Sequence, residues 1–450
     1  MRSFLTAIIF MFLSIQLFSQ ARLALDEAIN IALHKNSFLL TATNNLESVE
    51  SNLQAAWGNF LPSLGLNANW DYSESNVEGV GTVVINGIPI PRLATTTTSR
   101  NYRGSVYSNW TLFDGLSNFA TLSQSENNLE SAEFSLERIK QDIVFQTMTL
   151  YYNIVYTKQL LKVKDDDLKW NEKNLETIKE RNRLGAATLA DVYQQEVATG
   201  SAELEIINTQ NQLATAEKDL LFYLGLDVLE EYTFSDTLTA AEVEILNTNL
   251  LSDFDDMTET VNAALNQRFD FKSAILNLES AKDGVSIAQS GHWPYLIASG
   301  NYSMFTDNIS NLDQTRTLSF GLSLNFPIFE GWSVSDRVQF AEVQAKNSEI
   351  ELNDLERDIK RQLKITFLDL QASQKGLLVS QNNVAAAREN LKIEEEKYSL
   401  GSGKLLDVLI ANSRYTTALT DLINAQFAYI VFSQQLKYQL GVLDYKQYEQ

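Results

Sequence analysis

Hydrophobic and polar positions follow two different periods along the chain, and the longer period predicts very long helices. After Gly115, apolar residues recur every seven positions, with a single step of four in the middle. They are Leu129, Leu136, Ile143 and Leu150, then Ile154, Leu161, Leu168 and Leu175. A seven-residue repeat places one apolar stripe along a coiled-coil helix, and the four-residue step is a stutter in it. A helix over 116–184 would be on the order of 100 Å long, at 1.5 Å per residue.

The chain contains two copies of one structural unit. Landmark residues of 59–226 recur in 291–442 at a constant offset of 216 residues. For example, Gly185 recurs as Gly401, and Gly225 recurs as Gly441. The apolar stripe returns as Ala345, Leu352, Ile359, Thr366, Leu370, Leu377, Val384 and Leu391. Repeated units of this kind usually bury their apolar faces against each other. We therefore expect one long helical hairpin in each repeat.

The ends of the expected helices carry capping residues. Gly185 and Gly401 suit the C-terminal caps of the two long helices, and Thr188 suits the N-cap of the first return helix. Proline, which breaks helix interiors, is absent from both hairpin segments. Shorter helices are expected before the strands of each repeat, over 25–59 and 256–290.

A two-residue period marks the windows that contain the five prolines. Apolar residues alternate with small or polar residues in four stretches, at about 62–73, 101–113, 294–305 and 317–327. The stretch 101–113 is the weakest case, because Tyr107 and Phe113 fall out of phase. Strands of about ten residues with one apolar face are typical of a membrane β-barrel, although a half-buried soluble sheet alternates in the same way. Four strands cannot close a barrel alone, since the smallest single-chain barrels use about eight.

Aromatic residues lie at the ends of these strands. Aromatic belts mark the membrane interfaces of barrels, although aromatic side chains also fill soluble cores. The segment 74–101 is expected to be an external loop, longer than its counterpart 306–316. The interface candidates are Trp70, Tyr72, Trp110, Trp293 and Tyr295.

The N-terminus and the composition restrict the compartment and the partners. Residues 1–19 have the charge and the apolar run of a secretory signal peptide, with an N-terminal membrane anchor as the alternative. The chain has no cysteine, which excludes disulfides, thiolate metal sites and a lipid-modified cysteine. Its net charge of −22 argues against nucleic acid and anionic lipid as partners, because both require clustered basic residues.

Catalytic chemistry finds no support in the sequence. The chain has two histidines, His34 and His292, and neither lies in a cluster with metal-ligand spacing. The segment Gly401-Ser402-Gly403-Lys404 lacks the spacing of a phosphate-binding loop. We therefore expect neither an enzyme nor a protein with a cofactor or a metal site.

Several short motifs accompany this alternation of strand pairs and long hairpins. They are Leu25-Asp26-Glu27-Ala28 with Ala32-Leu33, Phe60-Leu61-Pro62, Phe113-Asp114-Gly115, Phe329-Glu330-Gly331, and the turns Arg183-Leu184-Gly185 through Asp191-Val192 and Tyr398-Ser399-Leu400-Gly401 through Asp407-Val408. In these residues the chain resembles the TolC-like outer-membrane efflux protein family. It departs from the family at Ser37 and Phe269, where a proline is common.

The resemblance implies a fold class and an assembly. The chain would be mainly α-helical with a membrane β-barrel, forming a homotrimer with a twelve-stranded barrel in the outer membrane and a twelve-helix periplasmic tunnel. The first repeat would cover 20–226, an equatorial linker 227–255, the second repeat 256–441 and a tail 442–450. The implied partners are outer-membrane lipid, a periplasmic adaptor protein and an inner-membrane transporter.

The implied function is an exit duct for efflux or type I secretion, with cargo that the sequence does not identify. A periplasmic adaptor also uses long hairpins, but it would carry one hairpin flanked by small β-domains. A soluble coiled-coil scaffold is the third alternative, and it would not fractionate with outer membranes.

The resemblance also assigns roles to the two hairpin turns. Asp407 would contribute to a ring of three carboxylates that attracts cations, although it also suits the start of a helix. A second acidic ring is not expected, because Ile410 occupies its position. Further candidates for the gate are Asp191, Tyr398 and Lys404, and Lys404 could instead pair with Asp407. The residues implied to face the adaptor, or simply to form the turns, are Arg183, Leu184, Gly185, Leu400 and Gly401.

Overall fold

The computed structural model describes residues 22–91, 94–235, 245–246, 257–311 and 314–448. The expected signal peptide lies outside these residues, as does part of the expected linker 227–255. The chain divides into two compact units, each built from segments distant in sequence. The hairpin unit comprises Met1–Asn45, Glu133–Ser273 and Asn353–Gln450, and the sheet unit comprises Leu46–Ala132 and Ala274–Leu352.

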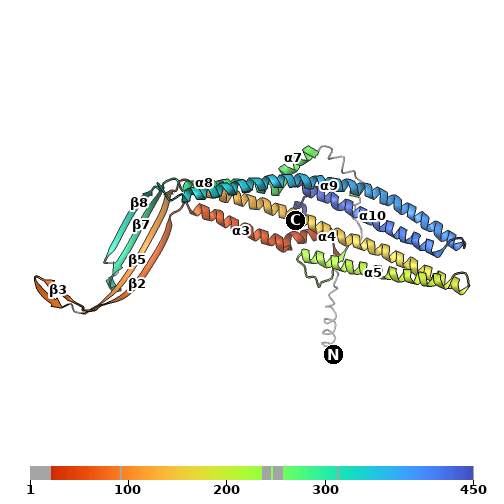
Figure 1. The fold of residues 1–450 in the computed structure, drawn as a ribbon, viewed down its shortest axis with the longest axis horizontal. Helices are drawn as coiled ribbons and strands as arrows, with labels where there is room; N and C mark the ends of the chain where they lie inside the picture. The colour runs from red at the N-terminus through yellow and green to blue at the C-terminus, as the bar shows by residue number, and fades with distance from the viewer. Residues whose placement is uncertain (1–21, 92–93, 236–244, 247–256, 312–313, 449–450) are drawn as a thin grey trace, which may run out of the picture. The chain divides into compact units, whose positions relative to one another are not determined.

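The sheet unit contains an antiparallel sheet of four strands in the order β2-β5-β7-β8. A separate small hairpin, β3 with β4, lies beyond the ends of β7 and β8 on an extension of β2 and β5 (Figure 1). The strands are β2 (Ser63–Val77), β3 (Thr82–Ile85), β4 (Ile88–Pro91), β5 (Thr95–Phe113), β7 (Tyr295–Thr306) and β8 (Arg316–Asn325).

One face of this sheet is apolar and exposed. Residues paired across antiparallel strands point to the same face, so Leu66, Val106, Tyr302 and Leu318 form one row across the sheet. The exposed apolar residues on the two outer strands are Leu64, Leu66, Trp70, Tyr72, Leu318, Phe320, Leu322 and Leu324. The alternation read from the sequence therefore gives the correct face.

The two residues out of phase in β5 have separate physical explanations. A β-bulge between Thr111 and Phe113 shifts the register, so that Phe113 pairs with Leu296 and returns to the apolar face. Tyr107 does point to the polar face. It lies opposite Gly65, whose missing side chain leaves room for the ring.

The segment 74–101, expected to be a loop, is β-structure for most of its length, while its expected external location stays a prediction. β2 continues to Val77, β5 begins at Thr95, and the small hairpin lies between them. The extension pairs residues such as Ser75 with Thr97, which are polar on both faces. Threonine favours strands because its side chain is β-branched. The sequence analysis looked for strands with one apolar face, so it did not detect this two-stranded ribbon, which is polar on both faces.

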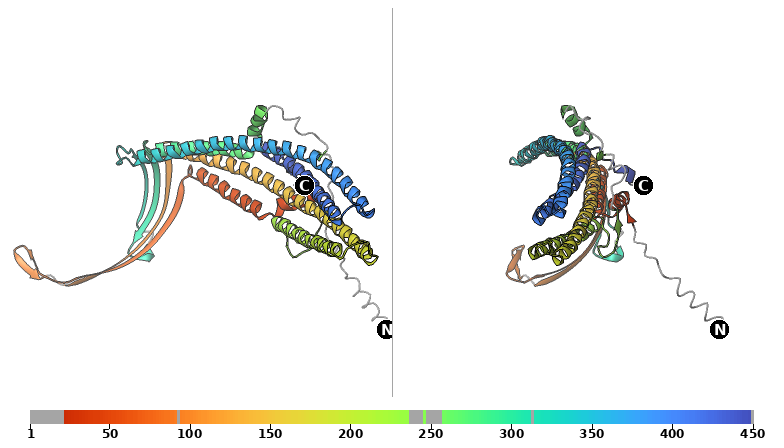
Figure 2. Two further views of the ribbon diagram at one scale, coloured as in Figure 1. Left: turned by 45° about the vertical axis from the view of Figure 1, so that its right-hand side comes forward. Right: turned by 90° about the vertical axis from the view of Figure 1, so that its right-hand side faces the viewer.

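The hairpin unit is helical. Figures 1 and 2 show α5 running back along α4, and α10 running back along α9. A short parallel bridge joins β1 (Arg22–Leu23) to β6 (Thr233–Phe234). The helices that contribute to this unit are α2 (Leu25–Lys35), α3 (Ser37–Gly58), α4 (Ser117–Arg183), α5 (Leu189–Tyr223), α7 (Met257–Gln267), α8 (Phe269–Ser290), α9 (Ser333–Ser399) and α10 (Leu405–Leu440).

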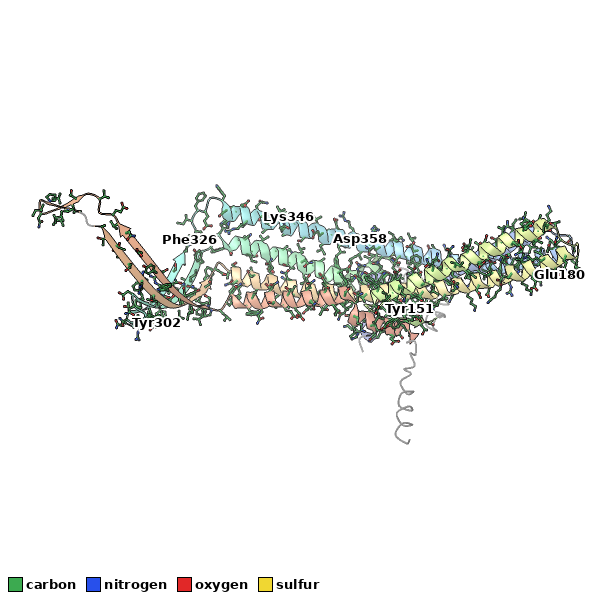
Figure 3. The ribbon with its side chains drawn as sticks, turned by 90° about the horizontal axis from the view of Figure 1, so that it is seen from below. Tyr151, Glu180, Tyr302, Phe326, Lys346 and Asp358 are labelled. Carbon is green, nitrogen blue, oxygen red and sulfur yellow. The ribbon has the colours of Figure 1, made fainter. Side chains whose placement is uncertain are left out.

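The apolar stripe of the sequence forms the core of this unit. Ile143, Ile154, Ile359 and Leu370 are at most 2% exposed, and the core also includes Leu220 and Leu224 of the first return segment. Tyr151, labelled in Figure 3, donates a hydrogen bond of 3.1 Å to the carbonyl of Leu23. The stutter therefore keeps the stripe in the core on both of its sides, while most other stripe positions are half-buried. Within the described residues, none of the helices has a stretch long and apolar enough to span a membrane.

The single helices expected over 25–59 and 256–290 are each broken in two. At the first break, the Asn36 carboxamide oxygen accepts hydrogen bonds from the backbone N–H of Phe38 and Leu39, while its nitrogen donates to the carbonyl of Tyr223. Asn36 thus caps the start of α3. At the second break, Arg268 lies between α7 and α8 and binds Gln439 and Asp270. Both breaks occur without a proline.

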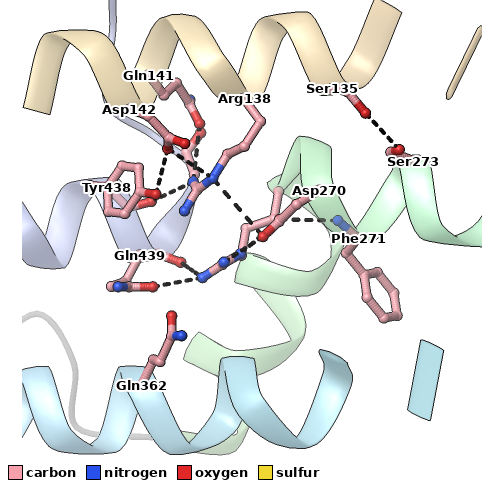
Figure 4. Close-up of polar contacts among 12 residues, drawn as sticks. Ser135, Arg138, Gln141, Asp142, Asp270, Phe271, Ser273, Gln362, Tyr438 and Gln439 are labelled. Carbon is pink, nitrogen blue, oxygen red and sulfur yellow. Dashed lines mark hydrogen bonds and ion pairs between the residues drawn. The ribbon is translucent and has the colours of Figure 1, made fainter. Parts of the chain in front are cut away.

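A buried cluster of charged and polar residues lies where α4, α8 and α10 meet (Figure 4). Arg268 is 3% exposed, donates to Asp270 (2.6 Å) and donates to the side-chain oxygen of Gln439 (2.7 Å). Arg138 lies over the ring of Tyr438, 3.7 Å from its centroid, and near Asp142 and Asp270. Two cations and two carboxylates balance, so that the cluster buries no net charge.

Candidate functional site

The first hairpin turn is a glycine-capped helix end. The backbone N–H of Gly185 donates to the carbonyl of Asn182 (2.9 Å), and that of Ala186 donates to Arg181 (2.8 Å). Gly185 has a φ of 75°, which residues with a side chain rarely adopt. The Asn182 side chain closes the loop by donating to the carbonyl of Ala187 (2.8 Å).

The return helix α5 begins with a capping box. The Thr188 hydroxyl oxygen accepts from the backbone N–H of Asp191 (3.1 Å), and the Asp191 carboxylate accepts from the backbone N–H of Thr188 (2.9 Å). The hydroxyl of Thr188 also donates to the same carboxylate oxygen (2.7 Å). The carboxylate of Asp191 is therefore occupied by its own helix start.

The second turn has the same backbone shape but different capping. Gly401 has a φ of 75°, and the backbone N–H groups of Ser402 and Gly403 both donate to the carbonyl of Lys397 (3.0 Å). Lys404 stands at the N-cap of α10, where its side chain makes no capping hydrogen bond. Asp407 occupies the position equivalent to Asp191, and its side chain is exposed. In the described part of the chain, Lys404 and Asp407 form no ion pair with each other.

Arg181 and Tyr398 join the two turns. The guanidinium of Arg181 lies 4.7 Å from the ring centroid of Tyr398 and donates to its carbonyl oxygen (3.4 Å). Beneath this contact, the apolar side chains of Ile178, Val192 and Leu405 form a small buried cluster that also contacts Tyr398. Burial raises the pKa of Tyr398, and the Asp191 carboxylate adds to this effect, while Arg181 opposes it. The phenol therefore stays neutral at physiological pH.

The sequence analysis missed Arg181 and named Arg183 instead. Arg183 is exposed and forms a pair with Glu180 on its own helix, with Nε to carboxylate oxygen at 2.9 Å; Glu180 is labelled in Figure 3. Arg181 follows Ile178 by three residues and so continues its buried helix face. Continuing the seven-residue stripe from Leu175 gives Asn182, so the period carries no signal for Arg181.

The extreme tips of both turns are apolar and exposed. Leu184 is 66% exposed and Leu400 is 83% exposed, and each precedes the glycine that caps its helix. Large apolar side chains at such exposure are unfavourable in water unless a partner covers them. The two tips belong to one unit of the fold.

A polar cavity of about 390 Å³ lies among α4, α5 and α10, several helical turns away from the hairpin turns along these helices. The Asp167 carboxylate accepts from the Asn412 side chain (2.7 Å) and from the Thr416 hydroxyl (2.9 Å). Next to it, Gln195 is completely buried and donates to the carboxamide oxygen of Asn171 (2.9 Å). These five polar residues gave no sequence signal, because polar residues of these types are also usual on the exposed face of a helix.

The structure separates the aromatic candidates of the sheet unit into two levels. On one apolar face, Trp70 pairs with Tyr102 of β5, and Trp110 follows eight residues later on the same strand. This separation is roughly 27 Å along a strand at 3.4 Å per residue. Tyr72 lies near Trp70, whereas Trp293 and Tyr295 lie near the Trp110 end of the sheet, and the pairing of Tyr295 with Asn325 places its side chain on the polar face. The Trp110 indole N–H donates to the carbonyl of Phe60 (2.9 Å).

Metal-ligating groups do not gather in the described residues, where no three His, Asp or Glu side chains are arranged to hold an ion. The features that distinguish the chain are the joined turns, the exposed apolar tips and the apolar sheet face.

Comparison with known proteins identifies one family. The family model described as "Outer membrane efflux protein" matches residues 28–226 and 260–442. Outer membrane protein TolC of Escherichia coli (strain K12) is 23% identical over 450 residues, covering 95% of this chain and 82% of that protein. Proteases secretion protein PrtF of Dickeya chrysanthemi is 21% identical over 431 residues, covering 95% of this chain and 90% of that protein.

Solved structures share the fold. CusC, described in terms of transmembrane channel formation, superposes with a TM-score of 0.81 at 17% identity, covering 93% of this chain and 92% of that chain. The outer membrane protein VceC from Vibrio cholerae gives a TM-score of 0.78 at 19% identity, covering 93% and 96%. These two likenesses establish a fold that includes both the strands and the long hairpins.

Proposed function

Because the chain belongs to the outer membrane efflux protein family, whose members are outer-membrane channels for efflux or secretion, we propose that three copies form one duct gated at the hairpin turns. The sequence analysis named this family, and the fold class and the channel function that it implied are confirmed. A periplasmic adaptor, the alternative, finds no support among the relatives.

The edges of the sheet support the proposed assembly. β2 and β8 are the outer strands of the four-stranded sheet, and each has one unpaired edge within the described residues. A sheet of four strands leaves these hydrogen-bonding groups unsatisfied, and a lipid environment does not tolerate an open edge. In a ring of three chains, β8 of one copy pairs with β2 of the next, and a twelve-stranded barrel has no edge.

The two aromatic levels support the proposed position in the membrane. The apolar band of an outer-membrane barrel is about 25 Å tall and is flanked by aromatic girdles. Trp70 and Tyr72 would stand at one interface and Trp110 and Trp293 at the other, whereas Tyr295 lies at the second level on the polar face. The exposed apolar side chains of β2 and β8 between these levels would face outer-membrane lipid.

The hairpin turns would form the gate and the constriction at the periplasmic end. Arg181 and Tyr398 would hold the two turns of one chain together, with Asp191 and Lys404 beside them. Asp407 is free of a capping partner, so its carboxylate is available to the lumen. Three such carboxylates in a narrow pore would attract cations and would bind polyvalent cations.

The exposed tips would be the docking site for a periplasmic adaptor. Leu184 and Leu400 supply the apolar contacts, while Gly185 and Gly401 keep the turns tight, and Arg183 adds a charge at the rim. An inner-membrane transporter would act through this adaptor. The described residues 227–235 and 442–448 would form part of a belt around the tunnel.

Single-channel conductance of the purified protein in planar bilayers tests this function. We expect cation-selective channels that are blocked by a trivalent cation added on the periplasmic side. Asp407→Ala should abolish the block and reduce the selectivity, whereas Asp191→Ala, the matched change at the capped carboxylate, should retain the block. Absence of any channel would contradict the proposed duct, and an unchanged block in Asp407→Ala would contradict the acidic constriction alone.

A further inference from the structure

The small hairpin of β3 and β4 is apolar on both faces and exposed. Val83 pairs with Ile90 and Ile85 pairs with Ile88, which places these four side chains on one face. Val84 pairs with Pro89 on the opposite face. The exposed fractions reach 65% for Val84 and Ile88. A hairpin without a polar face is not suited to standing alone in water.

A polar ribbon carries this hairpin away from the four-stranded sheet. β5 pairs with β7 only from Tyr102 onward, so residues 95–101 of β5 pair with β2 alone. This two-stranded stalk is seven residue pairs long, from Asp71 with Asn101 to Val77 with Thr95, or roughly 24 Å at 3.4 Å per residue. Its residues are mostly Ser, Thr, Asn and Glu on both faces. The stalk suits water, whereas the tip, called the apolar tip from here on, does not.

Two prolines protect one edge of the apolar tip from strand addition. In an antiparallel pair, alternate residues direct their N–H groups outward, and Pro89 and Pro91 have no N–H to offer. They alternate along β4 and therefore occupy its outward-directed positions. Proline at such positions is a known means of blocking edge-to-edge aggregation. Strand addition at the β4 edge is therefore blocked, and a partner on this side is bound through side chains.

We infer that the apolar tips of three copies pack against one another over the outward end of the duct and narrow it. This inference rests on the proposed trimer. The stalk continues directly from β2, the strand that would form the chain-to-chain interface, so the tip contact is continuous with that interface.

The length and the charge of the stalk and tip fit this arrangement. A twelve-stranded barrel is roughly 25 Å across for strands about 4.8 Å apart and tilted by about 40°, so a stalk of roughly 24 Å is longer than the distance from the barrel wall to the axis. Glu78 is the single charged residue from Ser75 to Pro91, so three tips can meet with little repulsion. Lipid is a poorer partner, because the stalk carries the tip beyond the aromatic level of Trp70 and Tyr72.

Oxidative cross-linking tests the contact cleanly, because the chain has no cysteine. Ile88→Cys in the full-length protein, reconstituted at less than one trimer per vesicle, should give a covalent dimer on mild oxidation that a reductant reverses. Ser73→Cys, placed in the stalk, should remain monomeric, because disulfides require Cα atoms within about 7 Å. Monomeric Ile88→Cys in a protein that still forms channels would overturn the inference and leave the duct intact.

Two further measurements separate the other outcomes. Ile88→Asn combined with Val84→Asn should increase channel conductance several-fold, whereas Thr97→Asn in the stalk should leave it unchanged. If vesicles instead protect Ile88→Cys from a water-soluble maleimide without any dimer, the tip inserts in lipid and the inference is wrong. Failure of the unmodified protein to form trimers or channels would refute the proposed duct itself.

Discussion

The guanidinium of Arg181 lies over the ring of Tyr398, 4.7 Å from its centroid. This contact joins the end of α4 to the end of α9, and so it joins the two repeats at their turns. Burial keeps the tyrosine neutral by raising its pKa. The contact therefore does not depend on pH near neutrality.

Replacing Arg181 with alanine should favour the open duct. The change removes a cation–π contact worth ~1 kcal/mol and a hydrogen bond from a charged donor. A loss of ~1–2 kcal/mol changes a two-state ratio by about 5–30-fold. We expect a higher open probability in single-channel recordings, at unchanged ion selectivity.

Arg183→Ala is the matched control for this prediction. Arg183 lies two residues away and pairs with Glu180 at the surface of the same helix, where an ion pair contributes little. Its removal should leave the open probability unchanged. If both variants raise the open probability equally, the loss of a positive charge explains the increase, and the contact with Tyr398 does not.

The unequal capping of the two return helices leads to a second prediction. Thr188→Ala removes the capping box of α5 and should cost ~1 kcal/mol of stability, which lowers the apparent unfolding temperature in detergent. Lys404→Ser, the opposite change at the equivalent position of α10, should raise it. The same change should weaken the trivalent-cation block, because a capping box would engage the Asp407 carboxylate. A stronger block in Lys404→Ser would contradict this account.

Much of the fold could be predicted because repetition and period are strong signals. The stripe through Ile143 and Ile359 gave both long helices, and the offset between Gly185 and Gly401 gave both turns. Alternation of apolar and polar residues gave the apolar face of all four strands, because every second side chain of a strand points to the same face of the sheet. These features depend on sums over many residues, and a single exception such as Thr366 does not change them.

The parts that could not be predicted depend on single residues acting at a distance. Asn36 breaks a helix because its side chain reaches the carbonyl of Tyr223, and nothing near Asn36 in the sequence announces that partner. The bulge before Phe113 corrects an apparent phase error. Arg181 matters because of Tyr398, more than 200 residues away, and Lys404 matters because it fails to cap. Local patterns do not contain these relationships.

The buried cluster around Arg268 leads to a third prediction. Asp270→Asn leaves the 3%-exposed Arg268 without its carboxylate, and breaking a buried ion pair costs ~3 kcal/mol. We expect a clear fall in the unfolding temperature of the detergent-solubilised protein. Asp358→Asn, which breaks a surface pair with Arg361, should change stability by only ~0.5 kcal/mol.

The stabilisation that the Asp270 carboxylate contributes to the fold should disappear in acid. Burial alone would raise the pKa of Asp270, but the hydrogen bonds and charge of Arg268 outweigh burial and hold it below its usual value. The folded protein then binds fewer protons at this site than the unfolded chain. The stabilisation is complete above the unfolded pKa of about 3.9 and is lost as the pH falls through the folded value. The difference between the original protein and Asp270→Asn should therefore shrink below about pH 4.

The pairing of Gly65 with Tyr107 leads to the last prediction. A Cβ atom on Gly65 would lie 2.4 Å from the ring of Tyr107, so Gly65→Ala forces the ring to move and should cost ~1–3 kcal/mol. Gly104→Ala, on β5 with open space around it, should be neutral or stabilising by about 0.5 kcal/mol. Adding Tyr107→Ala should recover most of the loss in Gly65→Ala, because the two residues couple directly. If the double variant is as unstable as the sum of both single variants, the ring does not occupy the space above Gly65, and the off-phase tyrosine has another cause.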